Sequence, residues 1–248
     1  MHRPVPRPIP FRQGAAALCL AAGLLLSPVS ASAQHRTNLL WLEPGKVDIA
    51  KIVGLPPAMT SPEQRAEFEE VLQITLNRTP EREKAAIADQ YQTLARFLEG
   101  AGIPFAGNEH REVRLLFREA QVELGLVLLS VRRMTNRTRP FGVWNKVRVK
   151  PCPGGRPDGT SFPSGHAATA ALYAELLDEA VPELAAKFEE RVKDHQESRL
   201  VCGFHYRSDL AAGDRAGRAV AKALLADRAF RARFDETKPE IRLALGLK

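Results

Sequence analysis

Four arginines lie close together in the middle of this 248-residue sequence: Arg132, Arg133, Arg137 and Arg139. A guanidinium group binds phosphate or carboxylate oxygens through a planar fork of N–H donors, so this cluster could hold an anion. Most clusters of this kind are simply the solvated end of a helix. The arginines therefore indicate an anion site only if other groups of matching chemistry accompany them.

The segment Pro163-Ser164-Gly165-His166 precedes an alanine-rich stretch that favours a helix. The N–H groups in the first turn of a helix have no intrahelical partner and can bind an anion. Ser164 can cap that turn or donate to a phosphate oxygen, and Gly165 lets the backbone approach closely. His166 can supply a proton near neutral pH. Taken alone, the segment has a simpler interpretation, a serine cap followed by an uninvolved histidine.

A third group of polar residues consists of Ser198-Arg199, His205 and Asp209. On one shared helix, His205 and Asp209 would stack on the same face. We favour a helix that begins near Ser208, so that the Asp209 carboxylate reaches back to the imidazole. In both cases Asp209 holds one ring nitrogen as N–H and leaves the other free to attack phosphorus. Considered alone, Asp209 could equally be an acid that interacts with a helix dipole.

Together the three groups resemble the signature of the phosphatidic acid phosphatase type 2 superfamily, which includes bacterial class A non-specific acid phosphatases, lipid phosphatases and vanadium haloperoxidases. That signature is Lys, six residues, Arg-Pro; then Pro-Ser-Gly-His; then Ser-Arg, five residues, His, three residues, Asp. The sequence matches every fixed position between 132 and 209 except the first, where Arg132 replaces lysine. Arg207 also stands where many members have proline. Upstream, Arg78-Thr79-Pro80 looks like the soluble acid phosphatases.

The resemblance implies hydrolysis of phosphomonoesters in two steps. His205 is implied as the nucleophile that forms a phosphohistidine, Asp209 as the group that orients it, and His166 as the acid and then the base. The implied phosphate-binding residues are Arg132, Arg139, Ser164, Gly165 and Arg199. Positioned cations can stabilise the charge on the non-bridging oxygens, so we expect no metal ion and no cofactor.

Most of the elements that would position these groups show apolar residues at helical spacing. This spacing predicts helices from Pro62 to about 76, from Pro80 to Gly100, over 109–133, 167–177 and 183–197, and from about 208 to 226. Residues 139–159 are rich in proline and glycine and should form a loop. Residues 34–60 should form an extended N-terminal arm. No segment alternates like a strand, so we expect an all-α, single-domain bundle over 61–248; the resemblance implies the acid phosphatase/vanadium haloperoxidase type.

Residues 1–33 have the pattern of a secretion signal: basic residues, an apolar run from Ala15 to Leu26, and the small residues Ala31-Ser32-Ala33. Cleavage is expected before Gln34, with export to the periplasm; an uncleaved anchor is the alternative. Removing these 33 of the 248 residues leaves 215, enough for one domain. Losing their three arginines lowers the formal charge from +7 to +4, which argues against a nucleic-acid partner.

Cys152 and Cys202 would remain in the exported chain, where an oxidising compartment allows a disulfide. Two separate buried thiols are equally compatible with the spacing. The other histidines, His35, His110 and His195, are expected to be surface residues.

Several functions compete with hydrolysis of a small phosphorylated substrate. A lipid-phosphate or lipid-pyrophosphate phosphatase would act on the membrane surface, because the exported chain offers no spanning segment. A vanadium-dependent haloperoxidase would use the same residues to hold vanadate, and bromide oxidation with peroxide would reveal it. An inactive phosphate-binding protein is the non-enzymatic alternative, although both motif histidines and Asp209 are present. The sequence is silent on the oligomeric state.

Overall fold

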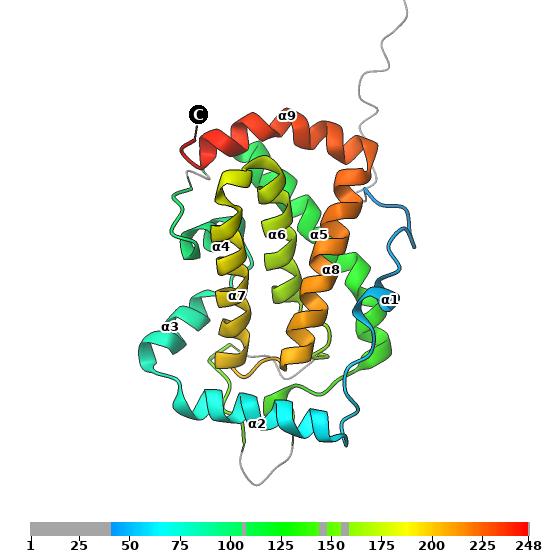
Figure 1. Ribbon diagram of the computed structural model, residues 1–248, viewed down its shortest axis with the longest axis vertical. Coiled ribbons are helices and arrows are strands. Elements are labelled where there is room, and N and C mark those ends of the chain that lie inside the picture. The colour runs from blue at the N-terminus through cyan, green and yellow to red at the C-terminus, as the bar shows by residue number, and fades with distance from the viewer. Residues whose placement is uncertain (1–40, 106–107, 144–147, 155–158, 248) are drawn as a thin grey trace, which may run out of the picture. The chain divides into compact units, whose positions relative to one another are not determined.

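The computed structural model describes residues 41–105, 108–143, 148–154 and 159–247. Within these residues the chain forms α-helices, two short 3-10 turns (Pro140–Gly142 and Pro182–Leu184) and no strand, which confirms the predicted all-α class (Figure 1). No helix among them combines the length and the apolar character that crossing a membrane requires. The predicted signal segment and His35 lie outside the described residues.

Three helices form the centre of the bundle: α6 (Gly165–Ala180), α7 (Ala185–Val201) and α8 (Arg207–Ala226), with α9 crossing one end and α2 the other (Figure 1). Two glycines let α8 approach α6 closely. A Cβ atom would lie 2.3 Å from the Ser164 carbonyl oxygen at Gly213, and 2.1 Å from the Ala168 carbonyl oxygen at Gly217. The N–H of Ser164 also donates to the Asp209 carbonyl oxygen at 3.0 Å, so the first turns of α6 and α8 lie side by side.

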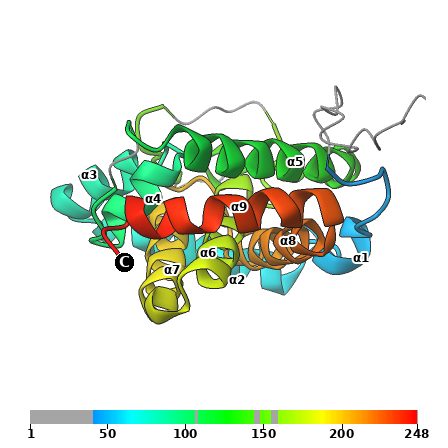
Figure 2. The ribbon, with the colours of Figure 1, turned by 90° about the horizontal axis from the view of Figure 1, so that it is seen from above.

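Helix α5 (Arg111–Thr135) forms a second layer over this centre (Figure 2). Its buried face includes Phe117, Leu124, Leu128 and Val131, which belong to the main hydrophobic core. The helix ends at Asn136, whose left-handed backbone (φ 36°) turns the chain away. The layer therefore carries the first arginines of the predicted site to the open ends of α6 and α8.

Helix α2 (Pro62–Asn77) begins as predicted, with Ser61 as its cap. The prediction of one helix from Pro80 to Gly100 is wrong, because the structure contains two helices there, α3 (Pro80–Ala88) and α4 (Leu94–Gly100). The break follows from tertiary contacts: Asp89 leaves the helix to bind the buried Arg191 at 2.5 Å. Thr93 then caps α4 by accepting a hydrogen bond from the Arg96 N–H.

Two further helices were not predicted. The segment expected to be extended contains the short helix α1 (Ile49–Val53), whose two end residues are buried. Helix α9 (Arg228–Ala244) follows α8 directly, and the Asp227 side chain caps it by accepting hydrogen bonds from two backbone N–H groups. Phe230 and Phe234 anchor α9 to the main core.

Cys152 and Cys202 form a disulfide, which decides between the two interpretations of the sequence. Both residues are buried, and the N–H of Cys152 donates to the Cys202 carbonyl oxygen at 3.1 Å. The bond joins the segment after the arginine cluster to the end of α7. By closing a long loop it can stabilise the folded chain by about 4 kcal/mol.

Candidate active site

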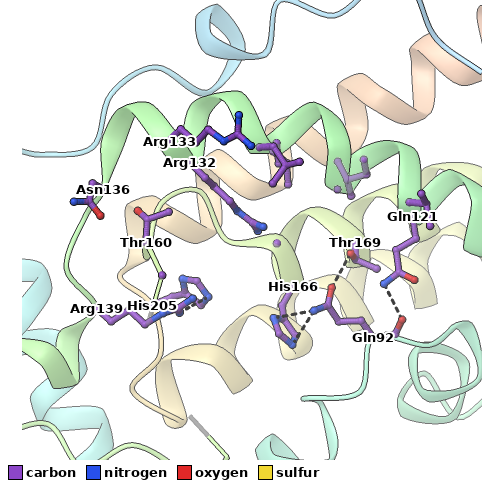
Figure 3. Close-up of a pocket in the computed structure, with 17 residues that line it drawn as sticks. Gln92, Gln121, Arg132, Arg133, Asn136, Arg139, Thr160, His166, Thr169 and His205 are labelled. Atoms are coloured by element: carbon purple, nitrogen blue, oxygen red, sulfur yellow. Dashed lines mark hydrogen bonds between the residues drawn. The ribbon is translucent and has the colours of Figure 1, made fainter. Parts of the chain in front are cut away.

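A pocket of about 890 Å³ opens where the first turn of α6 and the last turns of α5 meet. Of the eight predicted site residues, five line it: Arg132, Arg139, Gly165, His166 and His205. Figure 3 shows Arg132 reaching from α5 into the space between His205 and His166. The other three, Ser164, Arg199 and Asp209, are fully buried behind this lining.

His205 lies just before α8, in the geometry that the sequence favoured. Its Nδ1 is 2.8 Å from the Ser161 carbonyl oxygen, which can only accept, so Nδ1 carries the proton. Nε2 therefore holds a lone pair, and it lies 3.2 Å from Nη1 of Arg139. Burial lowers the pKa of His205 to about 4, which keeps the ring neutral near pH 7. A neutral imidazole with Nε2 at the pocket is suited to nucleophilic attack.

Asp209 is held by several donors at the start of α8. It accepts hydrogen bonds from the Ser161 hydroxyl at 2.5 Å and the Tyr206 N–H at 2.8 Å, and one oxygen lies 3.5 Å from Nδ1 of His205. Burial alone would raise the pKa of Asp209, but contact with His205 and the charge of Arg137 hold it below its ordinary value. The carboxylate is therefore ionised beside the imidazole.

Arg137 lies behind Asp209 rather than in the pocket. Its guanidinium is 2.6 Å from Asp209 and 2.7 Å from Glu67, and it also donates to Gln64 and to the Ser208 hydroxyl. The ring of Tyr206 lies 4.2 Å from the guanidinium carbon. Arg137 thus links α2 to the start of α8, a role that its place in an arginine cluster did not reveal.

His166 lies in the first turn of α6. Its Nε2 lies 3.2 Å from the Gln90 carbonyl oxygen, which can only accept, so Nε2 carries the proton. The Gln92 amide nitrogen lies 3.3 Å from Nδ1 and 3.2 Å from Nε2, and of these two only Nδ1 can accept from it. Burial, followed by the charge of Arg199, holds the pKa of His166 well below its ordinary value. The ring is therefore neutral near pH 7, and it acts as an acid only if a bound group raises its pKa.

His195 is buried, so the prediction of a surface residue is wrong. Its ring stacks near that of His166, with centroids 6.2 Å apart, and burial lowers its pKa to about 3. The helical spacing of α7 carries a signal for this, because His195 follows Val192 by three residues and Phe188 by seven, on the buried face of the helix. His110 is half-buried and pairs with Glu240.

Two cations keep hydrogen-bond donors that meet no acceptor in the described residues. The Arg132 side chain has no hydrogen-bond or ion-pair partner there, and burial lowers its pKa. Arg199 donates through Nη2 to the Ala86 carbonyl oxygen, whereas its Nε and Nη1 have no partner. Gly165 is needed beside Arg132, because a Cβ there would lie 2.3 Å from Nη2. An anion in this space would satisfy these donors.

Ser164 caps α6 by accepting a hydrogen bond from the Ala167 N–H at 3.3 Å. The N–H groups of Gly165 and His166 begin the helix, where no intrahelical acceptor is available to them. Arg133, also part of the arginine cluster, lies exposed at the pocket edge. Among the described residues, no three His, Cys, Asp or Glu side chains are grouped as a metal site would require.

Two curated relatives are non-specific acid phosphatases. The protein from Salmonella typhi is 40% identical over 86 residues, 34% of each chain, and the protein from Providencia stuartii is 28% identical over 149 residues, 58% of this chain and 59% of that one. The chain thus matches between about a third and three fifths of these relatives' own length. Comparison with models of known protein families gives no match.

Among solved structures, the chain is similar to the first transmembrane PAP2 type phosphatidylglycerolphosphate phosphatase from Bacillus subtilis. The TM-score is 0.49 and the identity 20%, over 76% of this chain and 92% of that one. The acid phosphatase relatives and the gathering of the three sequence motifs at one pocket agree. They confirm the resemblance of this chain to the phosphatidic acid phosphatase type 2 superfamily, and in particular to its bacterial non-specific acid phosphatases.

Proposed function

We propose that this protein is an exported phosphatase that hydrolyses phosphomonoesters through a phosphohistidine on His205. The observation that carries the proposal is the neutral His205 ring, with its protonated Nδ1 held by Ser161 and its Nε2 beside the pocket. The unsatisfied donors of Arg132 and Arg199 support it, because a phosphate dianion offers the acceptors that they lack. The relatives are named non-specific acid phosphatases, and a phosphatase hydrolyses the same kind of phosphate ester bond.

In the first step, Nε2 of His205 attacks phosphorus and the bond from phosphorus to the ester oxygen breaks. The leaving oxygen takes a proton from His166, whose pKa is raised by the charge of the bound dianion. The positive charge that develops on the His205 ring is stabilised by Asp209, 3.5 Å from Nδ1. Arg132, Arg139 and Arg199 stabilise the non-bridging oxygens.

In the second step, a water oxygen attacks phosphorus and the bond from phosphorus to Nε2 breaks. His166, now neutral, accepts the proton of the water, and inorganic phosphate leaves. The proton that His166 gave to the leaving group is thereby restored, and His205 returns to its neutral form. No step uses a metal ion.

The test is hydrolysis of phenyl phosphate by the purified protein with excess chelator, comparing wild type with His205→Ala. A denaturing quench at alkaline pH, where the phosphorus–nitrogen bond of a phosphohistidine survives, should trap a ³²P-labelled protein in wild type and none in the variant. His110→Ala is the matched control, since that histidine pairs with Glu240 away from the pocket. Loss of activity on chelation, or full activity in His205→Ala, would overturn the mechanism.

A lipid-phosphate phosphatase is the second candidate, because exposed apolar side chains of α5, Val122 and Leu129, stand at the pocket edge. Faster hydrolysis of phosphatidic acid in detergent micelles than of phenyl phosphate would select it.

A further inference from the structure

The wall of the pocket opposite the catalytic histidines is one stripe of α5. Gln121, Gly125, Leu128 and Arg132 all line the pocket, at spacings of four, three and four residues. Such spacings place side chains on one face of a helix. Seven residues of helix separate Gly125 from Arg132, a rise of about 10 Å. The wall therefore continues beyond the phosphate-binding end by roughly the length of a ring-sized group.

Gly125 is the unusual member of this stripe. It lies in the interior of a 25-residue helix, where glycine costs up to about 1 kcal/mol relative to alanine. Its backbone is not in the left-handed region, so the helix itself does not require glycine. A Cβ atom at Gly125 would meet nothing within 4 Å.

Other glycines of the bundle differ in this respect. At Gly165, Gly213 and Gly217 a Cβ would lie within 2.3 Å of another atom, so close packing explains them. At Gly125 the space that a side chain would occupy is part of the pocket. The absence of a side chain there enlarges the pocket instead of allowing contact between helices.

The residues beside Gly125 define the character of this space. Leu128 forms the wall, and Val122 and Leu129 stand at its edge with 43% and 42% of their surfaces exposed. The cationic groups all lie toward the other end, with Arg132 and the histidines. The pocket thus has a charged end that suits phosphate and an uncharged end. At the uncharged end the apolar side chains of α5 accompany Gln121, Gln92 and Thr169, which hydrogen-bond to one another (Figure 3).

We propose that Gly125 is a specificity-determining residue, which opens a subsite for an apolar, ring-sized leaving group of the phosphomonoester. This inference rests on the proposed phosphatase function, since the charged end must hold the phosphate. Leu129 and Val122 contact the leaving group, with the buried Leu128 behind them, while its ester oxygen stays at His166. Substrates with a small leaving group do not reach the subsite.

The test compares kcat/KM for methyl phosphate and 1-naphthyl phosphate in wild type, Gly125→Ala and Gly125→Leu. We expect Gly125→Leu to lower kcat/KM for naphthyl phosphate about 30-fold and to change that for methyl phosphate less than about threefold. Gly125→Ala should fall between. Ser130→Leu is the matched control, because it adds similar bulk to an exposed position of α5 outside this pocket.

A second pair of variants tests whether apolar contacts determine the preference of the subsite. Leu129→Asn should reduce the preference for naphthyl over methyl phosphate about fivefold, since a pocket discriminates poorly once its apolar contact is lost. Leu126→Asn should leave it unchanged, because Leu126 is equally exposed, at 44%, on the same helix but does not line the pocket.

Equal loss on both substrates, or no loss in Gly125→Leu, would overturn the inference. Thermal unfolding and inhibition by inorganic phosphate show whether the variants keep their fold and their phosphate site. If wild type hydrolyses neither substrate, the proposed function itself fails, which is a different result from unchanged selectivity in an active enzyme.

Discussion

The charged side chains on the two sides of the pocket are satisfied in different ways. Beside His205, Asp209 and Arg137 bind each other at 2.6 Å and bind Glu67, Ser161 and Tyr206, forming what we call the paired half. Beside His166, Arg132 and Arg199 keep donors without acceptors in the described residues, forming the open half. The difference indicates that the nucleophile is positioned before substrate binds, whereas the anion site is completed by the substrate. Substitutions in the paired half should lower both the free energy of unfolding and the activity. Substitutions in the open half should lower the activity alone.

The largest effect should come from Arg137→Gln in the paired half. It leaves the buried carboxylate of Asp209 and the half-buried carboxylate of Glu67 without their cation, which should lower the free energy of unfolding by about 3–5 kcal/mol. Because Asp209 then loses its fixed position, kcat should fall at least about 100-fold with little change in KM. Urea unfolding and steady-state kinetics on phenyl phosphate measure the two effects.

Arg207→Gln is the matched control for Arg137→Gln, since Arg207 also pairs with an α2 glutamate, Glu70, but at the surface. Exposed pairs contribute about 0–1 kcal/mol. Arg137→Lys, which keeps the charge and loses the fork, should recover part of kcat. Equal effects of the two glutamine variants would contradict the distinction between the halves.

Arg132→Met should separate activity from stability in the open half. Removing a cation that stabilises the phosphate oxygens should lower kcat/KM about 100-fold and weaken inhibition by inorganic phosphate. The free energy of unfolding should stay the same or rise, because the guanidinium is partly desolvated and has no partner in the described residues.

Two variants control the Arg132 experiment. Arg132→Lys restores the residue usual in the superfamily and should retain activity within about tenfold. Arg133→Met removes the exposed neighbouring charge and should have a small effect. A marked loss of stability in Arg132→Met would show that this arginine has a structural role.

The contrast between the halves also explains which parts of the site were predictable. His166, Gly165 and Asp209 lie at helix starts, where capping residues and local spacing reveal them. The role of Arg137 depends on Glu67 and Gln64 in α2, which precede it by 70 and 73 positions, and no local pattern indicates such a contact. The break at Asp89 is likewise decided by Arg191, in a distant helix. His195 was misplaced for a different reason: it continues the buried stripe of Phe188 and Val192 on α7, and this spacing, rather than the polarity of the imidazole, indicates its burial.

The fold class followed from helical spacing and capping, which are local. The predicted starts at Pro62 and Pro80 are those of α2 and α3, and Ser61 and Thr79 cap the two helices. Helix α9 was missed because its charged residues outnumber the apolar ones that show its buried face. Its two anchoring phenylalanines gain their meaning only from the core against which they pack.

Stability should fall with acid, because His205 and His195 are buried and neutral. The pKa of His205 is lowered to about 4 and that of His195 to about 3, against roughly 6.5 in an unfolded chain. Between pH 6.5 and these lowered pKa values, the unfolded state binds more protons than the folded state. The contribution of the neutral rings to the free energy of unfolding is therefore complete above pH 6.5 and is lost as the pH falls toward 4. Each histidine contributes about 1 kcal/mol per pH unit.

Urea unfolding at pH 7.5, 6 and 5 measures this loss. His195→Asn should remove the contribution of one histidine and make the free energy of unfolding depend less steeply on pH. Saturating inorganic phosphate should remove the contribution of His166 in the same way, because a bound anion favours protonation of that ring. A midpoint that is constant from pH 7.5 to 5 would show that these rings are already charged in the folded protein.

The smallest effect should come from Gln92→Glu, which changes one atom beside His166. The Gln92 amide lies 3.3 Å from Nδ1, so a carboxylate there should raise the pKa of His166. If His166 is the acid, the alkaline limb of the kcat/KM profile, where it loses its proton, should move up by about one pH unit. Gln121→Glu adds the same charge to the pocket lining, but Gln121 donates to the Gln92 carbonyl oxygen, whereas the His166 ring contacts Gln92 and Gln90. A limb that moves equally in both variants reports the field of the added charge, whereas a shift confined to Gln92→Glu assigns the limb to His166 and to the open half.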